Sequence, residues 1–456
     1  MEIINPATED VITTLAKDSQ DDIQAKFELL TKGQTEWQEK TLLDRLELIN
    51  RFSYLLKENI DKLAATLTKE MGKPLAQSVG EIIGARKRIK FFLENSEKWL
   101  EPEVVHTEDN FREEIRYEPL GVIANISAWN YPYLVGVNVF IPALIGGNAV
   151  LYKPSEITSL TGLEIQRLMH EARIPENIFR TVIGDKDAGE TLLDLPLDGY
   201  FFTGSYNTGK YIYERVAKKM VPCQMELGGK DPLYVAEDVE SIQDVARAAA
   251  EGAFYNAGQS CCSVERIYVH EKIVEQFTKA YVKEVELYRI GNPSEAGVFI
   301  GPLARKPQLE YLKSQVADAV QKGGVLKTGG NIMGRNGYYF EPTVLSSVSH
   351  EMSVMKEESF GPVIGIQSVS NDDEAISLMQ DTVYGLTASV YTSDQNRAES
   401  IMKKMNTGSV YWNCCDRVSA NLPWSGRGNS GIGSTLSHIG IRAFVQPKAY
   451  HFSGPQ

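Results

Sequence analysis

The sequence predicts an α/β protein in which apolar strands alternate with helices. Short apolar runs, such as GVIANIS at 121–127 and NAVLYK at 148–153, are separated by segments with helical periodicity. This alternation implies a parallel sheet covered on both faces, and ligands of such folds bind at the carboxyl ends of the strands. Because domains average roughly 150 residues, the 456 residues suggest two or three domains.

The first hundred residues are expected to be mostly helical. Between residues 8 and 100, apolar side chains such as Leu42, Leu46 and Ile49 recur at helical spacing. Gly72-Lys73-Pro74 ends one of these helices. We expect the charged residues of this region to form a solvated face.

Residues 103–117 change character, because apolar residues there are interspersed with charged ones. This pattern is typical of a strand pair, and such a pair outside the core is often an oligomer contact.

Two α/β series follow. In the first, strands are expected at 121–127, 148–153, 178–183 and 199–203, with helices at 133–146, 160–173 and 187–193. In the second, strands are expected at 233–235, 266–269, 340–345, 363–368, 386–391 and 409–412, with helices at 241–256 and 272–288. The loop at 413–433 is long enough to be functional, and 444–452 reads as a terminal strand.

Composition and charge exclude several classes of partner. The chain is 43% hydrophobic and 23% charged, as is usual for a soluble globular protein. Its net charge of -13 argues against nucleic acid and anionic membranes. The longest apolar segment, 134–145, is too short to span a membrane, and the N-terminus lacks the pattern of a signal peptide. We therefore expect a cytoplasmic protein whose main partner is neither a nucleic acid nor a membrane.

The cysteines do not form a disulfide framework. There are five of them, Cys223, Cys261, Cys262, Cys414 and Cys415, and four of the five form two vicinal pairs. An odd number in this arrangement fits a reducing cytosol. No spacing of cysteine and histidine suggests a metal ligand set, so no metal is expected.

The segment FYNAGQSCCSV at 254–264 offers a candidate nucleophile, Cys261. Small residues ahead of the thiol let another backbone or a flat cofactor approach closely. Nearby backbone N–H groups can stabilise a thiolate or an oxyanion. The roles of Cys262, Cys414 and Cys415 are left open.

Glu226 and Asn130 could assist such a thiol. Glu226 lies among apolar residues in MELGGK. If it is buried, desolvation would raise its pKa toward that of a general base, whereas the alternative is an exposed glutamate at a strand end. Asn130 in SAWNYP follows a strand, where its amide could donate to an oxyanion or simply shape a turn, which Trp129 stiffens.

Two further motifs could bind a cofactor. Residues 204–211, GSYNTGKY, nearly match a phosphate loop, but Tyr211 replaces the hydroxyl residue that would bind magnesium, which disfavours an NTPase. A helix that begins near Gly204 and Ser205 could receive a cofactor phosphate, or Ser205 could be a structural N-cap. In EESFGPV, Glu358 could bind ribose hydroxyls and Phe360 could pack on a cofactor, unless the segment is only a turn.

Together these motifs identify a resemblance. SAWNYP, KPSE at 153–156, FTGS at 202–205, MELGGK, NAGQSC at 256–261, EESFGPV and PWSGRGNSG at 423–431 occur in this order along nearly the full chain. The sequence thereby resembles the aldehyde dehydrogenase superfamily.

The resemblance implies a domain organisation. It predicts a variant Rossmann cofactor domain (NAD-binding) from residues 1–101 and 119–227, and a second α/β catalytic domain from 228–425. A small β oligomerisation element would comprise 102–118 and 442–456, in a homodimer or homotetramer.

The resemblance also implies roles for individual residues. Cys261 would be the nucleophile, Glu226 the base that activates water, and Asn130 the oxyanion donor. The implied cofactor contacts are Trp129, Lys153, Glu156, Gly204, Ser205, Glu358 and Phe360. The implied reaction is NAD(P)-dependent oxidation of an aldehyde to the acid through a thiohemiacetal and a thioester. A CoA-acylating or reductive relative, and an inactive structural relative, are the alternatives.

Charge and local sequence bear on specificity. Glu156 would repel a 2′-phosphate, so NAD is expected over NADP, although the nearby Lys153 leaves NADP possible. Tyr206 is bulkier than the residue that is common at this position in the family that the sequence resembles. The loop at 413–417 also departs from the sequences that are frequent there. The identity of the aldehyde substrate is therefore left open. Arg417 could bind the distal carboxylate of a semialdehyde such as succinic semialdehyde, or could pair with Asp416 or solvent.

Overall fold

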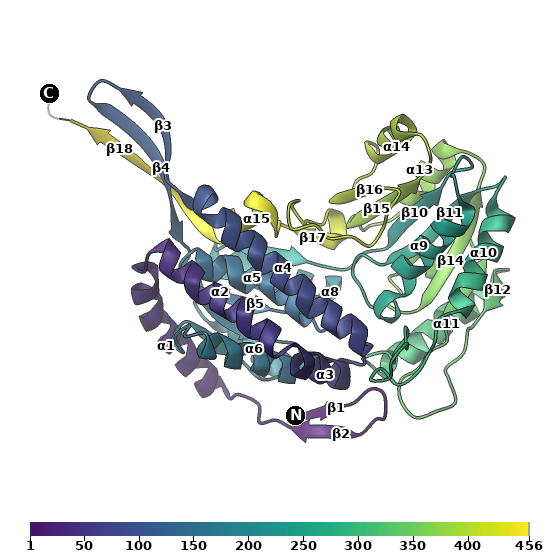
Figure 1. Ribbon diagram of the computed structural model, residues 1–456, viewed down its shortest axis with the longest axis horizontal. Coiled ribbons are helices and arrows are strands. Elements are labelled where there is room, and N and C mark those ends of the chain that lie inside the picture. The colour runs from purple at the N-terminus through teal and green to yellow at the C-terminus, as the bar shows by residue number, and fades with distance from the viewer. Residues whose placement is uncertain (455–456) are drawn as a thin grey trace.

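Two largely parallel sheets, one in each lobe of the molecule, form the frame of the computed structural model, which describes residues 1–454 (Figure 1). Their central strands are buried along their whole length, because helices cover both faces. The α/β fold class predicted from the sequence is confirmed.

The first sheet has the strand order β17-β9-β8-β5-β6-β7, and all its neighbours are parallel except β17 and β9. Its strands are β5 (Val122–Ile126), β6 (Ala149–Lys153), β7 (Phe179–Thr181), β8 (Gly199–Thr203), β9 (Cys223–Glu226) and β17 (Gly431–Ile432). The last of these comes from the far end of the chain and lies beside Glu226.

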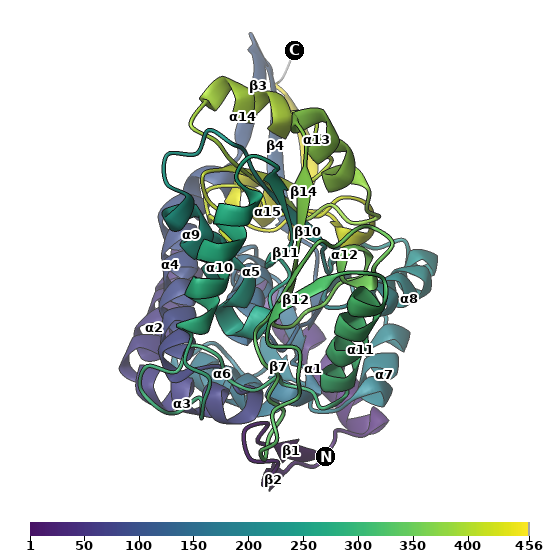
Figure 2. The same cartoon turned by 90° about the vertical axis from the view of Figure 1, so that its right-hand side faces the viewer.

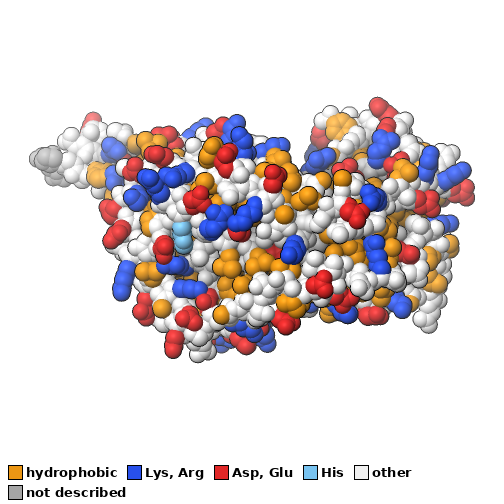
Figure 3. Space-filling model, turned by 60° about the horizontal axis from the view of Figure 1, so that its bottom comes forward, with side chains coloured by type: hydrophobic (Ala, Val, Ile, Leu, Met, Phe, Trp, Pro, Cys, Tyr) orange, Lys and Arg blue, Asp and Glu red, His pale blue; other side chains and the backbone are white. Residues whose placement is uncertain are grey.

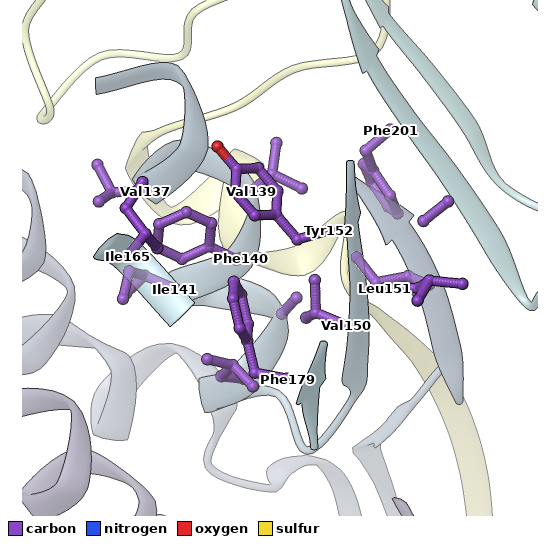
Figure 4. Close-up of a cluster of buried hydrophobic side chains, with 14 of the residues drawn as sticks. Val137, Val139, Phe140, Ile141, Val150, Leu151, Tyr152, Ile165, Phe179 and Phe201 are labelled. Carbon is purple, nitrogen blue, oxygen red and sulfur yellow. The ribbon is translucent and has the colours of Figure 1, made fainter. Parts of the chain in front are cut away.

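Eight helices belong to this lobe. They are α1 (Gln20–Gln38), α2 (Leu42–Glu58), α3 (Ile60–Met71), α4 (Leu75–Leu100), α5 (Pro132–Ile145), α6 (Ser159–Glu171), α7 (Lys186–Asp194) and α8 (Tyr206–Val216). Helix α5 is almost entirely buried, and Figure 4 shows its Phe140 pointing at the sheet. The Phe140 ring packs edge-on against Tyr152 and Phe179, with centroids 5.7 and 5.5 Å away.

The second sheet has the order β12-β13-β14-β11-β10-β15-β16, in which only β12 and β13 are antiparallel. Its strands are β10 (Asp231–Val235), β11 (Val264–His270), β12 (Val325–Thr328), β13 (Thr343–Ser346), β14 (Val363–Val369), β15 (Thr387–Tyr391) and β16 (Ser409–Trp412). Its helices are α9 (Ile242–Phe254), α10 (Val274–Glu286), α11 (Pro307–Gln321), α12 (Ser353–Lys356), α13 (Asp372–Gln380) and α14 (Gln395–Met402).

A three-stranded antiparallel arm projects from the first lobe (Figure 1). It consists of β3 (Glu103–Glu108), β4 (Phe111–Pro119) and β18 (Val445–Ser453), and the short helix α15 (Ser437–Arg442) precedes β18. The predicted strands at 103–117 and 444–452 are therefore present. The last two residues of the predicted element, 455 and 456, lie outside the described residues.

The expectation of helix throughout 8–100 is wrong at its beginning. Strands β1 (Glu2–Ile4) and β2 (Val11–Thr14) form an antiparallel pair that lies apart from both large sheets, at the lower end of the molecule in Figure 2. Val11-Ile12-Thr13-Thr14 is β-branched throughout, which favours a strand over a helix.

The expected solvated face of the early helices also has buried exceptions. Glu70, Lys73 and Glu81 are each no more than 3% exposed. Glu70 accepts hydrogen bonds from the N–H groups of Leu160 and Thr161, so it caps the beginning of α6. Burial raises the pKa of Glu70 to about 8.

The surface carries charges of both signs. On the face in Figure 3, Lys and Arg side chains are interspersed with Asp and Glu, and hydrophobic side chains lie in smaller groups between them. Across residues 1–454, no helix has the length and apolar character needed to cross a membrane.

Candidate active site

A strained turn presents the cysteine pair. Helix α9 ends at Phe254, and in the 3₁₀ turn Tyr255–Gly258 the residues Asn256 and Ala257 are left-handed, each with a φ of 54°. A Cβ atom on Gly258 would lie 2.4 Å from the carbonyl oxygen of Gly361. Only glycine fits there, so the turn packs directly against the segment that contains Phe360.

Hydrogen bonds tie this turn to Asn130. The Asn130 side-chain amide donates to the Gln259 carbonyl at 3.2 Å. The Asn256 amide donates to the carbonyls of Gln259 and Asn130, at 3.1 and 3.3 Å. The structure therefore brings Asn130 to the backbone two residues before Cys261, and the second amide hydrogen of Asn130 remains available to a ligand.

A buried ion pair that the sequence analysis missed holds the other side of Asn130. The Lys73 ammonium donates to the Asn130 carbonyl at 2.7 Å and is paired with Glu81, and both side chains are inaccessible to solvent. Glu81 in turn accepts from the Tyr133 N–H at 2.8 Å. The pair fixes the turn between β5 and α5. In the sequence, the only sign of this ion pair was that its lysine lies between a glycine and a proline at the end of a helix.

The two cysteines differ in environment. Cys261 is partly exposed, whereas Cys262 is buried. The Cys262 thiol lies 3.1 Å from Asp416 Oδ1 and donates to it. The adjacent Cys261 sulfur, together with burial, raises the pKa of Cys262 well above its ordinary value. Burial also raises the pKa of Asp416 to about 6. Cys262 is thus a protonated donor, and Cys261 is the sulfur that a substrate can reach.

Glu226 lies at the end of β9, between Thr203 of β8 and Gly431 of β17. It is buried, not the exposed strand-end residue considered above, and neither carboxylate oxygen has a hydrogen-bond partner among residues 1–454. Burial raises the pKa of Glu226 well above its ordinary value, and its neighbours Gln224 and Thr435 only partly oppose this effect.

The chain that follows Glu226 passes directly against the nucleophile loop. A Cβ atom on Gly229 would lie 2.9 Å from the Cys261 carbonyl oxygen. The Glu226 carboxylate is not hydrogen-bonded to Cys261. The strand end and the loop are therefore adjacent, while the carboxylate stays on the side of Gln224 and Thr435.

Glu358 and Phe360 meet this region from the second lobe. Glu358 Oε1 accepts from the Gly229 N–H at 3.0 Å, and it would lie 2.2 Å from a Cβ atom on Gly228. Burial, with the charge of Glu265 added, raises the pKa of Glu358 to about 8. The Phe360 ring is edge-on to Trp129, with centroids 5.4 Å apart. Two lobes thus converge on the Gly228-Gly229 segment.

The remaining predicted cofactor residues lie at the carboxyl ends of β6 and β8. Lys153 is buried, which lowers its pKa, while Glu156 is exposed. Ser205 follows Gly204 and is the N-cap of α8, but its hydroxyl donates to Thr208 Oγ1 and accepts no backbone N–H within residues 1–454. The first N–H groups of α8 are thus left without a side-chain cap, a setting that suits a phosphate.

These residues fit a dinucleotide. Carboxylates at 156 and 358 suit ribose hydroxyls, and a free helix N-terminus suits a pyrophosphate. The described part of the chain offers no comparable site for a metal ion. It contains no group of three or more His, Cys, Asp or Glu side chains that could hold one.

Arg417 lies apart from this network. It is exposed, and in the part of the chain that the structure describes it forms no ion pair with Asp416 or any other carboxylate. Its main-chain carbonyl accepts the hydroxyl of Tyr411. Asp416 is directed instead toward Cys262 and Ser260.

Comparisons with known proteins show what the whole chain is similar to. The sequence model of the aldehyde dehydrogenase family matches residues 1–450. A succinate-semialdehyde dehydrogenase [NADP(+)] of Deinococcus radiodurans is 30% identical, over 98% of this chain and 93% of its own length. The peroxisomal aminoaldehyde dehydrogenase 1 of Pisum sativum is 32% identical, over 98% and 91%. The crystal structure of an aldehyde dehydrogenase from Brucella melitensis superposes with a TM-score of 0.96 at 30% identity, over 100% of this chain and 94% of that one.

Proposed function

Because the chain belongs to the aldehyde dehydrogenase family, whose reaction class is the NAD(P)-dependent oxidation of aldehydes, we propose that it converts an aldehyde to the carboxylic acid through Cys261. One observation carries this proposal. The accessible sulfur of Cys261 lies in a loop tied to the Asn130 amide, and a buried carboxylate without hydrogen-bond partners, Glu226, ends the strand whose continuation touches that loop.

In the first step, the Cys261 thiolate adds to the aldehyde carbonyl carbon, and a thiohemiacetal forms. The charge on its oxygen needs preorganised donors. The free hydrogen of the Asn130 amide and the backbone N–H of Cys261 can supply them, since the turn at Asn130 is fixed by Lys73 and Asn256.

A bound nicotinamide supplies the acceptor for the hydride that leaves the thiohemiacetal carbon. Glu358, Phe360 and Trp129 would hold that end of the cofactor; in support, Glu358 accepts from Gly229 and the Phe360 ring packs on Trp129. The product of this step is a thioester on Cys261.

Glu226 then removes a proton from the water that attacks the thioester, which releases the acid and the Cys261 thiolate. A raised pKa suits a base at neutral pH. For this step the carboxylate must turn from Gln224 and Thr435 toward the thioester. Because neither of its oxygens is hydrogen-bonded, little holds it back.

Cofactor preference follows from the end of β6. Glu156 is exposed there and can accept hydrogen bonds from the two ribose hydroxyls of NAD, whereas it would repel a 2′-phosphate. Lys153 is buried beside it. We propose NAD as the preferred cofactor, with some use of NADP.

The CoA-acylating and inactive alternatives are less well supported. An acyl-transferring relative has no need of a buried base for water, yet Glu226 is present. An inactive structural relative would not need an accessible thiol in a strained loop. Formation of acid without added CoA separates the hydrolytic reaction from both.

The larger organisation is proposed on the same basis. The cofactor domain would comprise 1–101 and 119–227, the catalytic domain 228–425, and the oligomerisation element 102–118 and 442–456. The arm would join copies into a homodimer or homotetramer. Five cysteines, none in a disulfide, are compatible with a cytoplasmic location.

The decisive experiment compares the two adjacent cysteines. Cys261→Ala should abolish NADH formation from an aldehyde such as butanal, while Cys262→Ala should retain much of it, because Cys262 is a buried donor. Initial rates with NAD and NADP in the same assay test the cofactor preference. Activity retained by Cys261→Ala and lost by Cys262→Ala would contradict the assignment.

A further inference from the structure

Within residues 1–454, Arg88 has no evident structural partner of opposite charge on the helix pair that supports the Asn130 turn. It lies seven residues after Glu81 on α4, so both side chains are on the same face of that helix. Glu81 contacts the beginning of α5 at Tyr133. Arg88 Nη1 donates to the Leu134 carbonyl at 3.1 Å and to Asn138 Oδ1 at 2.9 Å, one turn further along α5. These two hydrogen bonds hold the Arg88 guanidinium in a fixed orientation against α5, the helix that follows Asn130.

Of the three nitrogen atoms of this guanidinium, only Nη1 is hydrogen-bonded within residues 1–454. No atom of residues 1–454 accepts a hydrogen bond from Nε or Nη2 of Arg88, and no described carboxylate lies within ion-pair distance. Burial lowers the pKa of Arg88 to about 10, an effect that negative charge on the cysteine pair would oppose. The group is thus a cation at neutral pH, and it lies between α4 and α5, the two helices that are joined by Glu81 next to the Asn130 turn. Arg88 is half-buried, and its other two nitrogens are not sealed in the interior, so a dissolved anion can reach them.

We infer that Arg88, oriented by Asn138, binds a carboxylate at the far end of the aldehyde, so that the substrates are aldehydes with a second, anionic end. This inference rests on the proposed function and adds the substrate class. Nε and Nη2 form one edge of the guanidinium, and that edge matches the two oxygens of a carboxylate in a bidentate pair.

The other charged groups of the region are already engaged or exposed. Asp416 accepts from Cys262 and Ser260, and Glu81 is paired with Lys73. Both contacts of Asp416 use Oδ1, so an aldehyde with a cationic end, such as 4-aminobutanal, tests Asp416 against Arg88 as the group that selects the substrate. Arg417, the other candidate for a distal carboxylate, is exposed and lacks the fixed orientation that Asn138 gives Arg88.

The test compares substrates of equal length that differ in charge. Wild-type protein should oxidise succinic semialdehyde with a higher kcat/KM than butanal and 4-aminobutanal. Arg88→Gln should lower kcat/KM for succinic semialdehyde on the order of 10²-fold, mainly through KM, with butanal changed less than about threefold. Arg88→Lys should recover part of the loss, because lysine keeps the positive charge but lacks the two parallel N–H donors of the guanidinium. Arg417→Gln is the matched control and should leave the ratio of the two substrates unchanged.

A second measurement does not depend on turnover or on the folding of a variant. In the wild type, succinate should slow the alkylation of Cys261 by iodoacetamide, and neutral succinamide should not. If butanal is oxidised but Arg88→Gln leaves the substrate ratio unchanged, or if succinate and succinamide protect equally, the role of Arg88 is refuted while the proposed function stands. If no aldehyde is oxidised at all, the proposed function itself fails and the inference falls with it.

Discussion

Glu226 and Glu358 are both buried carboxylates, but their surroundings differ. Glu358 accepts a backbone N–H, whereas neither oxygen of Glu226 has a hydrogen-bond partner among the described residues. A carboxylate without donors keeps its proton to higher pH and is a stronger base once ionised. This difference fits the proposed division of roles, in which Glu358 holds a cofactor and Glu226 accepts a proton.

Glu226→Gln should therefore stall the reaction after the first turnover. We expect a burst of about one NADH per Cys261 in stopped-flow absorbance, followed by steady turnover lowered about 10²-fold or more, because an amide cannot accept the proton of water. In the wild type, steady turnover should fall as the pH is lowered through the raised pKa of Glu226, since the protonated carboxyl is no base. Unimpaired steady turnover in Glu226→Gln would show that water is activated elsewhere.

The sequence could indicate only some of the site residues. Cys261, Asn130 and Glu226 lie in local motifs, so their candidacy was visible without a structure. Lys73 was visible only as part of a helix end, and Glu81 and Arg88 were not visible at all, because charged residues at helical spacing are typical of a solvated face. They reach the site only when α4 packs on α5, and no local pattern encodes that contact.

Helix α4 is the element that connects stability to the proposed chemistry. Its first half carries Glu81, which pairs with Lys73, and Lys73 supports the Asn130 turn. Further along the same helix, Lys90 and Glu94 form a pair that is largely exposed to solvent. One helix thus offers a buried and an exposed ion pair for direct comparison.

Glu81→Gln should destabilise the protein by about 3–5 kcal/mol, because it leaves the Lys73 ammonium buried without its partner. Glu94→Gln on the same helix should change the free energy of unfolding by less than about 1 kcal/mol. The double variant Lys73→Met/Glu81→Leu should recover stability but not kcat, because Asn130 loses its support. Denaturant unfolding and steady-state rates measure the two effects, and a double variant with normal kcat would contradict the positioning role.

Most large elements were predicted, and the errors have physical reasons. Continuous apolar runs marked the parallel strands, since those strands are buried on both faces. Strand β13 begins at Thr343 and not at residue 340 as expected, since Phe340 pairs outside the sheet with Ile332. Strand β17 spans only two residues, too short for any periodicity.

On the scale of the whole molecule, the three-stranded arm is the part with the most exposed sheet edges. Its nine-residue strand β18 pairs with β4 along its full length, yet β3 and β18 are both edges of the sheet. Val104 and Val105 are each 56% exposed on it. Exposed edges with apolar side chains are usually covered by another chain, which supports the proposed homo-oligomer.

Replacing both arm valines, Val104→Lys with Val105→Lys, should lower the oligomeric mass measured by light scattering after size-exclusion chromatography. Lysines on an edge strand oppose pairing with a second copy. Val383→Lys, which alters an even more exposed valine in the second lobe, is the control and should leave the mass unchanged. A wild-type protein that is monomeric at all concentrations would contradict the proposed assembly.

The position of β17 has a consequence for the order of events during translation. The first sheet receives its edge strand from Gly431 and Ile432, which the ribosome makes long after β9. Until then, β9 is an open edge at Glu226. We therefore expect the nascent first lobe to stay incomplete and open to aggregation until β17 emerges, and a gene fragment ending at residue 227 would yield that vulnerable intermediate as its end product.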